Sequence, residues 1–154
     1  MNLTHARQLA KAKMKEHGLT GWTFKFDFAR RRSGCCDHRY KRIQLSKHYT
    51  KLNSEELVLN TILHEIAHAL IEAHHGHDRV WKRIALSIGC SGERCASEET
   101  IRSVGKFVAL CVCGKTYQRF KKIQKGAKYS CPCQRGKFGN KKHFLEFTLN
   151  EEWK

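Results

Sequence analysis

Five histidines lie within the fourteen residues from His64 to His77, and two of them belong to the pattern His64-Glu65-Ile66-Ala67-His68. Histidines four positions apart on a helix are one turn apart along its axis and about 40° apart around it, so both imidazoles can reach one metal ion. Glu65 lies beside that face, where its carboxylate can activate a zinc-bound water. Because such polar groups destabilise an apolar helix unless they have partners, the motif predicts a catalytic zinc site rather than ordinary core histidines.

A catalytic zinc ion usually has three protein ligands and keeps one position for water. The candidates for the third ligand are His74, His75 and His77. His74 has the metzincin spacing, but that pattern requires a glycine where this chain has Ile71 and a later methionine turn, and both methionines precede the motif. His75 would lie about 10 Å beyond the motif along a continuous helix. His77 follows a glycine at which the chain can reverse, so we predict His77.

Four further cysteines form two close pairs, Cys111 with Cys113 and Cys131 with Cys133, with seventeen residues between the pairs. Two pairs of thiolates on two turns predict a closed structural zinc site, which would stabilise a segment too small for its own core. Buried free thiols are the alternative, and the CxC spacing leaves open whether His143 replaces one thiolate. The remaining cysteines lack a partner set and are expected to be free thiols: Cys35, Cys36, Cys90 and Cys95.

The elements that must present these side chains follow from the apolar periodicity. Residues at helical spacing predict helices over 2–17, 54–76 and 78–88. Alternating aromatic and polar residues in WTFKFDF predict a half-buried strand over 22–28, and a weaker strand is predicted over 39–49. With a turn at Ser33–Gly34 between them, the two strands are expected to form an antiparallel hairpin. From about Gly105 the pattern changes to short apolar stretches and cysteine pairs.

In the order WTFKFDF, RIQLSKHY, LVLNTILHEIAHAL, GHDRVW and a cysteine-rich tail, the chain resembles the SprT-like (Spartan-type) zinc metalloproteases over residues 22–133. That family places its third zinc histidine in a short glycine–histidine segment ahead of an aromatic residue, which matches Gly76, His77 and Trp81. The resemblance therefore implies that His64, His68 and His77 bind the catalytic zinc and that Glu65 is the general base.

The same resemblance implies an α+β fold. Residues 1–104 would form a small zincin-like catalytic domain with the HExxH motif on its central helix. Residues 105–154 would form a basic, zinc-ribbon-like β segment with a second, structural zinc ion, since many members end in such a ribbon.

The implied activity is that of a zinc metalloprotease, an endopeptidase acting on nucleic-acid-associated proteins, as in DNA–protein crosslink repair. A non-catalytic, zinc-stabilised DNA- or RNA-binding adaptor and a hydrolase of non-peptide amides are the alternatives. Tyr40, Tyr49 and His75 are candidate donors to the oxyanion.

The charge favours a polyanionic partner. The net charge is +16, and the last 50 residues, with 12 basic and 3 acidic side chains, are more basic per residue than the first 104, with 18 and 11. Arg30, Arg31 and Arg32 could extend this surface. In the last segment basic groups that can contact phosphates alternate with aromatic rings that can stack on bases: Tyr117, Phe120, Tyr129 and Phe138. We expect DNA, single-stranded or duplex, as a partner, although an ordinary hairpin with inward-facing aromatics would share this pattern.

No run of eighteen apolar residues occurs, so no membrane-spanning segment is expected. The polar N-terminus is unlike a secretory signal. We therefore expect an intracellular protein, cytoplasmic or associated with the nucleoid or nucleus. In that setting the eight cysteines are metal ligands or thiols rather than disulfides.

Overall fold

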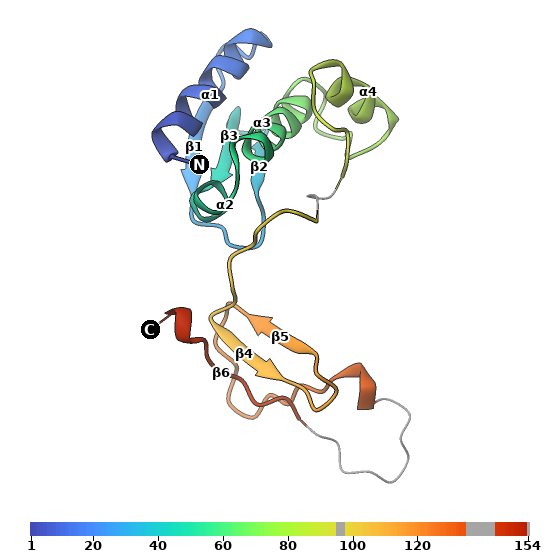
Figure 1. Cartoon of the computed structure of the whole chain (residues 1–154). Helices are drawn as coiled ribbons and strands as arrows, with labels where there is room; N and C mark the ends of the chain where they lie inside the picture. Colours follow the sequence, from blue (N-terminus) through green and yellow to red (C-terminus); the bar gives the residue numbers. More distant parts are fainter. Residues whose placement is uncertain (95–97, 135–143, 154) are drawn as a thin grey trace. The chain divides into compact units, whose positions relative to one another are not determined.

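The computed structural model describes residues 1–94, 98–134 and 144–153 of the chain (Figure 1). It divides into unit 1, Met1–Ser103, and unit 2, Val104–Lys154. Three residues named above, Cys95, Phe138 and His143, lie outside the described residues.

Unit 1 consists of four helices and a three-stranded sheet among its described residues: α1 (Leu3–Glu16), β1 (Thr23–Asp27), β2 (Gly34–Asp37), β3 (Arg42–Ser46), α2 (Lys47–Leu52), α3 (Glu55–Ala69) and α4 (Arg79–Ser87). Each helix begins after a side chain that accepts hydrogen bonds from free N–H groups of its first turn, as such caps do. These capping residues are Asn2, Ser46, Ser54 and Asp78.

The sheet has the order β1-β3-β2, and this corrects the predicted hairpin. The antiparallel pair is present, but its first strand is β2, which begins at Gly34 where a turn was predicted. The strand over Thr23–Asp27 instead lies parallel to β3 on its other side. Two parallel strands such as β1 and β3 must be joined by a crossover connection. Here that connection contains β2, which forms the edge of the sheet on the far side of β3. The segment after Ser46, predicted as strand, is the short helix α2.

One face of the sheet is buried by α1 and α3. Ile43 and Leu45 of β3 are fully buried, whereas Arg42 and Gln44, which alternate with them, are only partly covered, as expected when successive side chains alternate between faces. The helices add small and branched residues to the same core: Ala6, Ala10, Met14, Val58, Ile62 and Ile66. The core therefore fixes α3 against β2 and β3.

Unit 2 is smaller and holds a second sheet of order β5-β4-β6, formed by β4 (Phe107–Leu110), β5 (Thr116–Arg119) and β6 (Thr148–Leu149). Two short 3-10 turns, η1 (Pro132–Gln134) and η2 (Glu151–Trp153), complete its described elements. Both pairings are antiparallel. Ala109, Cys111 and Cys131 are the buried hydrophobic residues among those described in this unit. The chain is thus α+β, with a C-terminal segment that fits a zinc-ribbon-like fold. None of the described helices is long and apolar enough to cross a membrane.

Candidate metal centres

Three histidine side chains converge in unit 1, and they are the three predicted as ligands: His64, His68 and His77. The Nε2 atom of His77 lies 2.9 Å from that of His64 and 3.1 Å from that of His68. Imidazoles that bind one tetrahedral zinc ion at about 2.0–2.1 Å place their nitrogens about 3.3 Å apart. The three nitrogens therefore fit a single ion, and the group could hold a metal.

His77 reaches this position because α3 ends early. The predicted helix continued to Gly76, but α3 ends at Ala69, so the reversal uses the irregular residues that follow. Asp78 then caps α4 by accepting a hydrogen bond of 3.0 Å from the N–H of Trp81. This cap fixes the start of α4 and leaves His77 immediately ahead of it, facing the two histidines of α3.

The other two histidines of the cluster point elsewhere. His75 Nδ1 lies 2.7 Å from Asp78 Oδ2, and His74 Nδ1 lies 3.2 Å from Glu72 Oε2. Neither belongs to the group of converging nitrogens among the described residues. The prediction excluded His75 on the assumption that one helix continues to Gly76. That assumption was wrong, because α3 ends at Ala69. The structure nevertheless keeps His75 out of the group of converging nitrogens.

A tryptophan supports the three imidazoles from one side. Trp81 is 1 % exposed, and its ring centroid lies 4.7 Å, 5.3 Å and 4.6 Å from those of His64, His68 and His77. Burial lowers the pKa values of His64 and His68 to about 4 and also lowers the pKa of His77. His64 is further held by a hydrogen bond to the backbone of Glu93. Neutral, oriented imidazoles are the form that binds metal.

Glu65 adds a carboxyl group to the same place. It lines one cleft with the three histidines and is 7 % exposed. Burial raises its pKa to about 8, against the opposing effects of the Arg32 guanidinium and a hydrogen bond from the backbone of Cys36. A carboxyl group whose pKa is near neutrality can both accept and return a proton. A purely structural metal site would have no use for it.

The cleft has a volume of about 560 Å³ and a basic lining. Arg32 is paired with Asp27 at 2.6 Å and donates a hydrogen bond of 3.2 Å to the carbonyl of Gly34. The sequence suggested Arg30, Arg31 and Arg32 only as an extension of a surface, whereas the structure places them in the lining of the cleft that holds the histidines. Five arginines line the cleft: Arg30, Arg31, Arg32, Arg94 and Arg102.

Two of the suggested oxyanion donors are poorly placed. Tyr40 is 61 % exposed and does not line the cleft, and the Tyr49 hydroxyl already donates to the Leu57 carbonyl at 2.9 Å. Sequence reasoning missed His38, which lines the cleft and is near enough to His68 to help lower its pKa. The imidazole of His38 makes no hydrogen bond to the residues that the structure describes. No signal in the sequence singled it out, because β2, the strand that precedes it, was not predicted.

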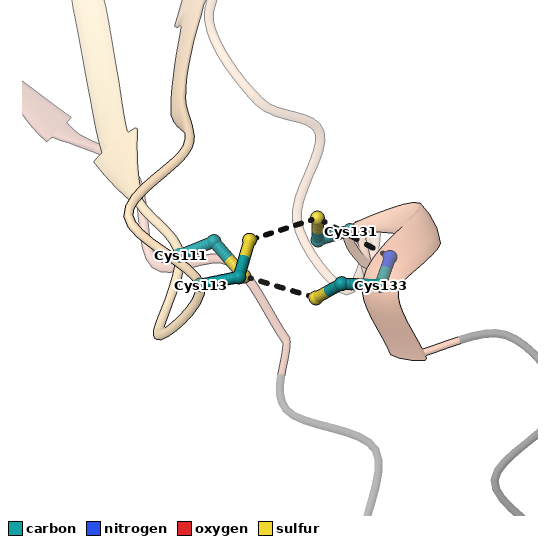
Figure 2. Close-up of side chains that lie close together, drawn as sticks. All are labelled: Cys111, Cys113, Cys131 and Cys133. Carbon is teal, nitrogen blue, oxygen red and sulfur yellow. Dashed lines mark hydrogen bonds between the residues drawn. The ribbon is translucent and has the colours of Figure 1, made fainter.

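Four sulfur atoms converge in unit 2, from the four cysteines that the sequence predicted: Cys111, Cys113, Cys131 and Cys133. Figure 2 shows one pair on the turn after β4 and the other at η1. The Sγ atoms of Cys111 and Cys133 are 3.5 Å apart and those of Cys113 and Cys131 are 3.7 Å apart. Tetrahedral zinc with Zn–S bonds of about 2.3 Å requires about 3.8 Å, and a disulfide about 2.05 Å. The spacing fits one metal ion.

A tyrosine supports this second cluster. The Tyr117 hydroxyl donates a hydrogen bond of 2.8 Å to Cys131 Sγ, and this bond is the first cause of a Cys131 pKa lowered to about 6. Tyr117 is one of the aromatic residues that the sequence offered for stacking on bases, and the structure directs its hydroxyl group towards the sulfur cluster. The other described cysteines, Cys35, Cys36 and Cys90, are free and join no group of potential metal ligands among the described residues.

Comparison with known proteins agrees with this geometry. The model of the SprT-like family matches residues 4–101, which contain the three histidines and Glu65. The match stops before the four cysteines of the second cluster. A search of curated proteins found no match.

Proposed function

The chain belongs to the SprT-like family, and on that premise we propose that it is a zinc-dependent endopeptidase of the HExxH type. The observation that carries the proposal is the buried Glu65 carboxyl group in the cleft of the three converging histidines. Three nitrogen ligands with an adjacent acid leave a position for water and provide a group to activate it. Zinc is the metal that this donor set and spacing favour.

In the proposed mechanism His64, His68 and His77 would hold the zinc ion, which when bound supplies a Lewis acid beside the scissile peptide carbonyl. Glu65 takes a proton from the attacking water and returns it to the leaving amine. Burial of Glu65 serves both steps, because it brings the carboxyl pKa towards neutrality. The ring of Trp81 on α4 packs against the histidine rings. His38, the residue that follows β2, lines the cleft.

The second zinc ion is proposed to be structural. All four of its ligands would be thiolates from Cys111, Cys113, Cys131 and Cys133, so no position remains for a substrate. Its neighbour is a tyrosine hydroxyl rather than a carboxylate that could act as a base.

We further propose that the substrates are proteins associated with DNA, as in the repair of DNA–protein crosslinks. The support is electrostatic. Unit 2 is strongly basic, and five arginines line the catalytic cleft. The phosphate groups of DNA would be attracted to each of these two surfaces. An adaptor without catalysis would share the charge and the cysteine cluster, but it would not require Glu65.

The test is a proteolysis assay of the full chain and of Glu65→Gln, each with elemental zinc analysis, with and without single-stranded and duplex DNA. The variant should retain both zinc ions, while cleavage falls by at least about 10²-fold, the lower end of general-base contributions. Autocleavage on storage gives an additional measure. A wild-type protein that cleaves no protein substrate under any of these conditions would support the adaptor instead.

A further inference from the structure

The edge strand β2 has a glycine, Gly34, on the face that it turns towards α3, the helix with the HExxH motif. Gly34 lies opposite Leu45, and Cys36 lies opposite Ile43. Directly opposed residues of antiparallel strands share a face, and both partners are fully buried. The face of β2 that carries Gly34 and Cys36 is therefore the face turned towards α3.

At Gly34 that surface touches Glu65. A Cβ atom added at Gly34 would lie 2.7 Å from Oε1, 2.8 Å from Cγ and 3.0 Å from Cδ of Glu65. Carbon atoms in proteins rarely approach side-chain atoms so closely, because optimal contacts lie near 3.5–4.0 Å. The Glu65 side chain would have to move if position 34 held any other residue.

Backbone conformation does not explain this glycine. Gly34 lies in regular strand, whereas Gly18 and Gly21 have positive φ angles of 71° and 79° and open space around them. Glycine is needed at those two positions for the backbone, and at Gly34 for space.

The neighbouring residue supplies a hydrogen bond. The N–H of Ser46 donates to the carbonyl of Ser33, so backbone groups of alternate residues in β2 face β3, and those of Gly34 and Cys36 face away from it. The outward N–H of Cys36 lies close enough to the Glu65 carboxyl group to act on it as a donor and to oppose the rise of its pKa. Strand β2 thus offers this carboxylate both a recess and a donor.

We propose that β2 positions the general base, with Gly34 as the positioning residue whose missing side chain leaves room for the Glu65 carboxylate against the Cys36 N–H. The catalytic consequence rests on the proposed function of Glu65, while the contact itself does not. A side chain at position 34 would displace the Glu65 side chain, which is flexible, and not the backbone. The fold can therefore survive while the general base is moved.

The first test measures catalysis by the zinc-loaded full chain. Gly34→Ala should lower kcat about 10- to 100-fold, as expected for a displacement of about 1 Å, with KM changed less than about twofold and both zinc ions retained. Glu65→Asp withdraws the carboxylate by one methylene. The shorter side chain leaves room for the new methyl group. The kcat of the double variant Gly34→Ala/Glu65→Asp should therefore be at least about fivefold higher than the value obtained by multiplying the losses of the two single variants. A double variant that shows the simple product would overturn the positioning role.

The second test reads the contact without catalysis. Gly34→Ala should lower the thermal unfolding midpoint in the wild-type background and leave it unchanged in the Glu65→Ala background, where the recess is empty. An equal loss in both backgrounds would overturn the proposal. If Gly34→Ala alone fails to fold, folding restored by Glu65→Ala supports the contact, and failure of both refutes it. An inactive wild type would refute the proposed function, and the unfolding test would still decide this inference.

Discussion

The two candidate metal centres use the same kind of convergence for opposite purposes. In unit 1 three imidazoles from α3 and from the residue before the α4 cap meet in a cleft of about 560 Å³, beside the Glu65 carboxyl group. In unit 2 four thiols from two turns meet, so a tetrahedral metal ion bound there would have no position left for water. The polar group next to these thiols is the hydroxyl of Tyr117, whereas in unit 1 it is the carboxyl group of Glu65. In the proposed function, the number of ligands and the chemistry of the nearest neighbour, rather than the metal, would make one centre catalytic and the other structural.

The centres also differ in what holds them. Two of the histidines, His64 and His68, lie on a helix that is fixed by two clusters of buried hydrophobic residues. The cysteines belong to a unit whose described residues bury little apolar side-chain volume besides two of the cysteines themselves. On the proposed function, a metal would therefore be an addition to the fold of unit 1 and a part of the fold of unit 2.

The largest expected effect follows from that contrast. Cys131→Ser should release one zinc ion and unfold unit 2, because structural zinc contributes apparent binding energies of about 10–16 kcal/mol in small zinc domains. Two-dimensional amide spectra should lose the dispersed signals of the second sheet and keep those of unit 1. Cys90→Ser, at a buried thiol outside the cluster, is the control and should retain both ions. A folded, zinc-free unit 2 would contradict the comparison.

Removing a ligand of the open centre should have a different outcome. His77→Ala should cost the zinc ion of unit 1, because two imidazoles alone rarely retain it, while the fold of unit 1 persists on its own core. Elemental analysis should give one zinc ion per chain. His74→Ala is the matched control, since its side chain pairs with Glu72 and not with the other rings. Loss of zinc from His74→Ala with retention in His77→Ala would reverse the assignment.

The units should differ in their contribution to DNA binding. Replacing the exposed residues Lys121, Lys122, Lys125 and Lys128 together by Gln should weaken binding and reduce the slope of log affinity against log salt by up to about 3. The control removes the same charge from exposed lysines of unit 1: Lys11, Lys15, Lys51 and Lys82. Titrations at several salt concentrations would measure both. Equal effects of the two sets would place the DNA surface outside unit 2.

The smallest expected effect concerns the tyrosine of the closed centre. Tyr117→Phe removes the hydroxyl that donates to Cys131 Sγ and keeps the ring. Groups that bond to metal ligands typically account for about 10- to 100-fold in metal affinity, so zinc should bind more weakly by that factor while unit 2 stays folded at saturating zinc. Competition with a chelator would measure this. An unchanged affinity would show that the thiolate needs no such donor.

The structure brings together the residues whose grouping was predicted from local spacing, and it departs from the prediction where the fold depends on strand order. His64 and His68 were identified from one helical turn, and the four cysteines from two short turns. The parallel pairing of β1 with β3 was missed, because alternation identifies a strand without identifying its neighbour. The early end of α3 was also missed, because the apolar residues Leu70, Ile71 and Ala73 continue the helical pattern beyond Ala69.

What the sequence determined by itself is the set of candidate metal ligands and the acid beside them: two histidines with a glutamate between them, a third histidine after a glycine, and two cysteine pairs. Only the tertiary structure decided what surrounds them. The recess at Gly34, the ring of Trp81 behind the imidazoles and the arginines lining the cleft come from elements that are separate in the chain. Spacing along one helix or turn fixes distances within it, but contacts between elements depend on how the core packs β2, β3 and α4 against α3.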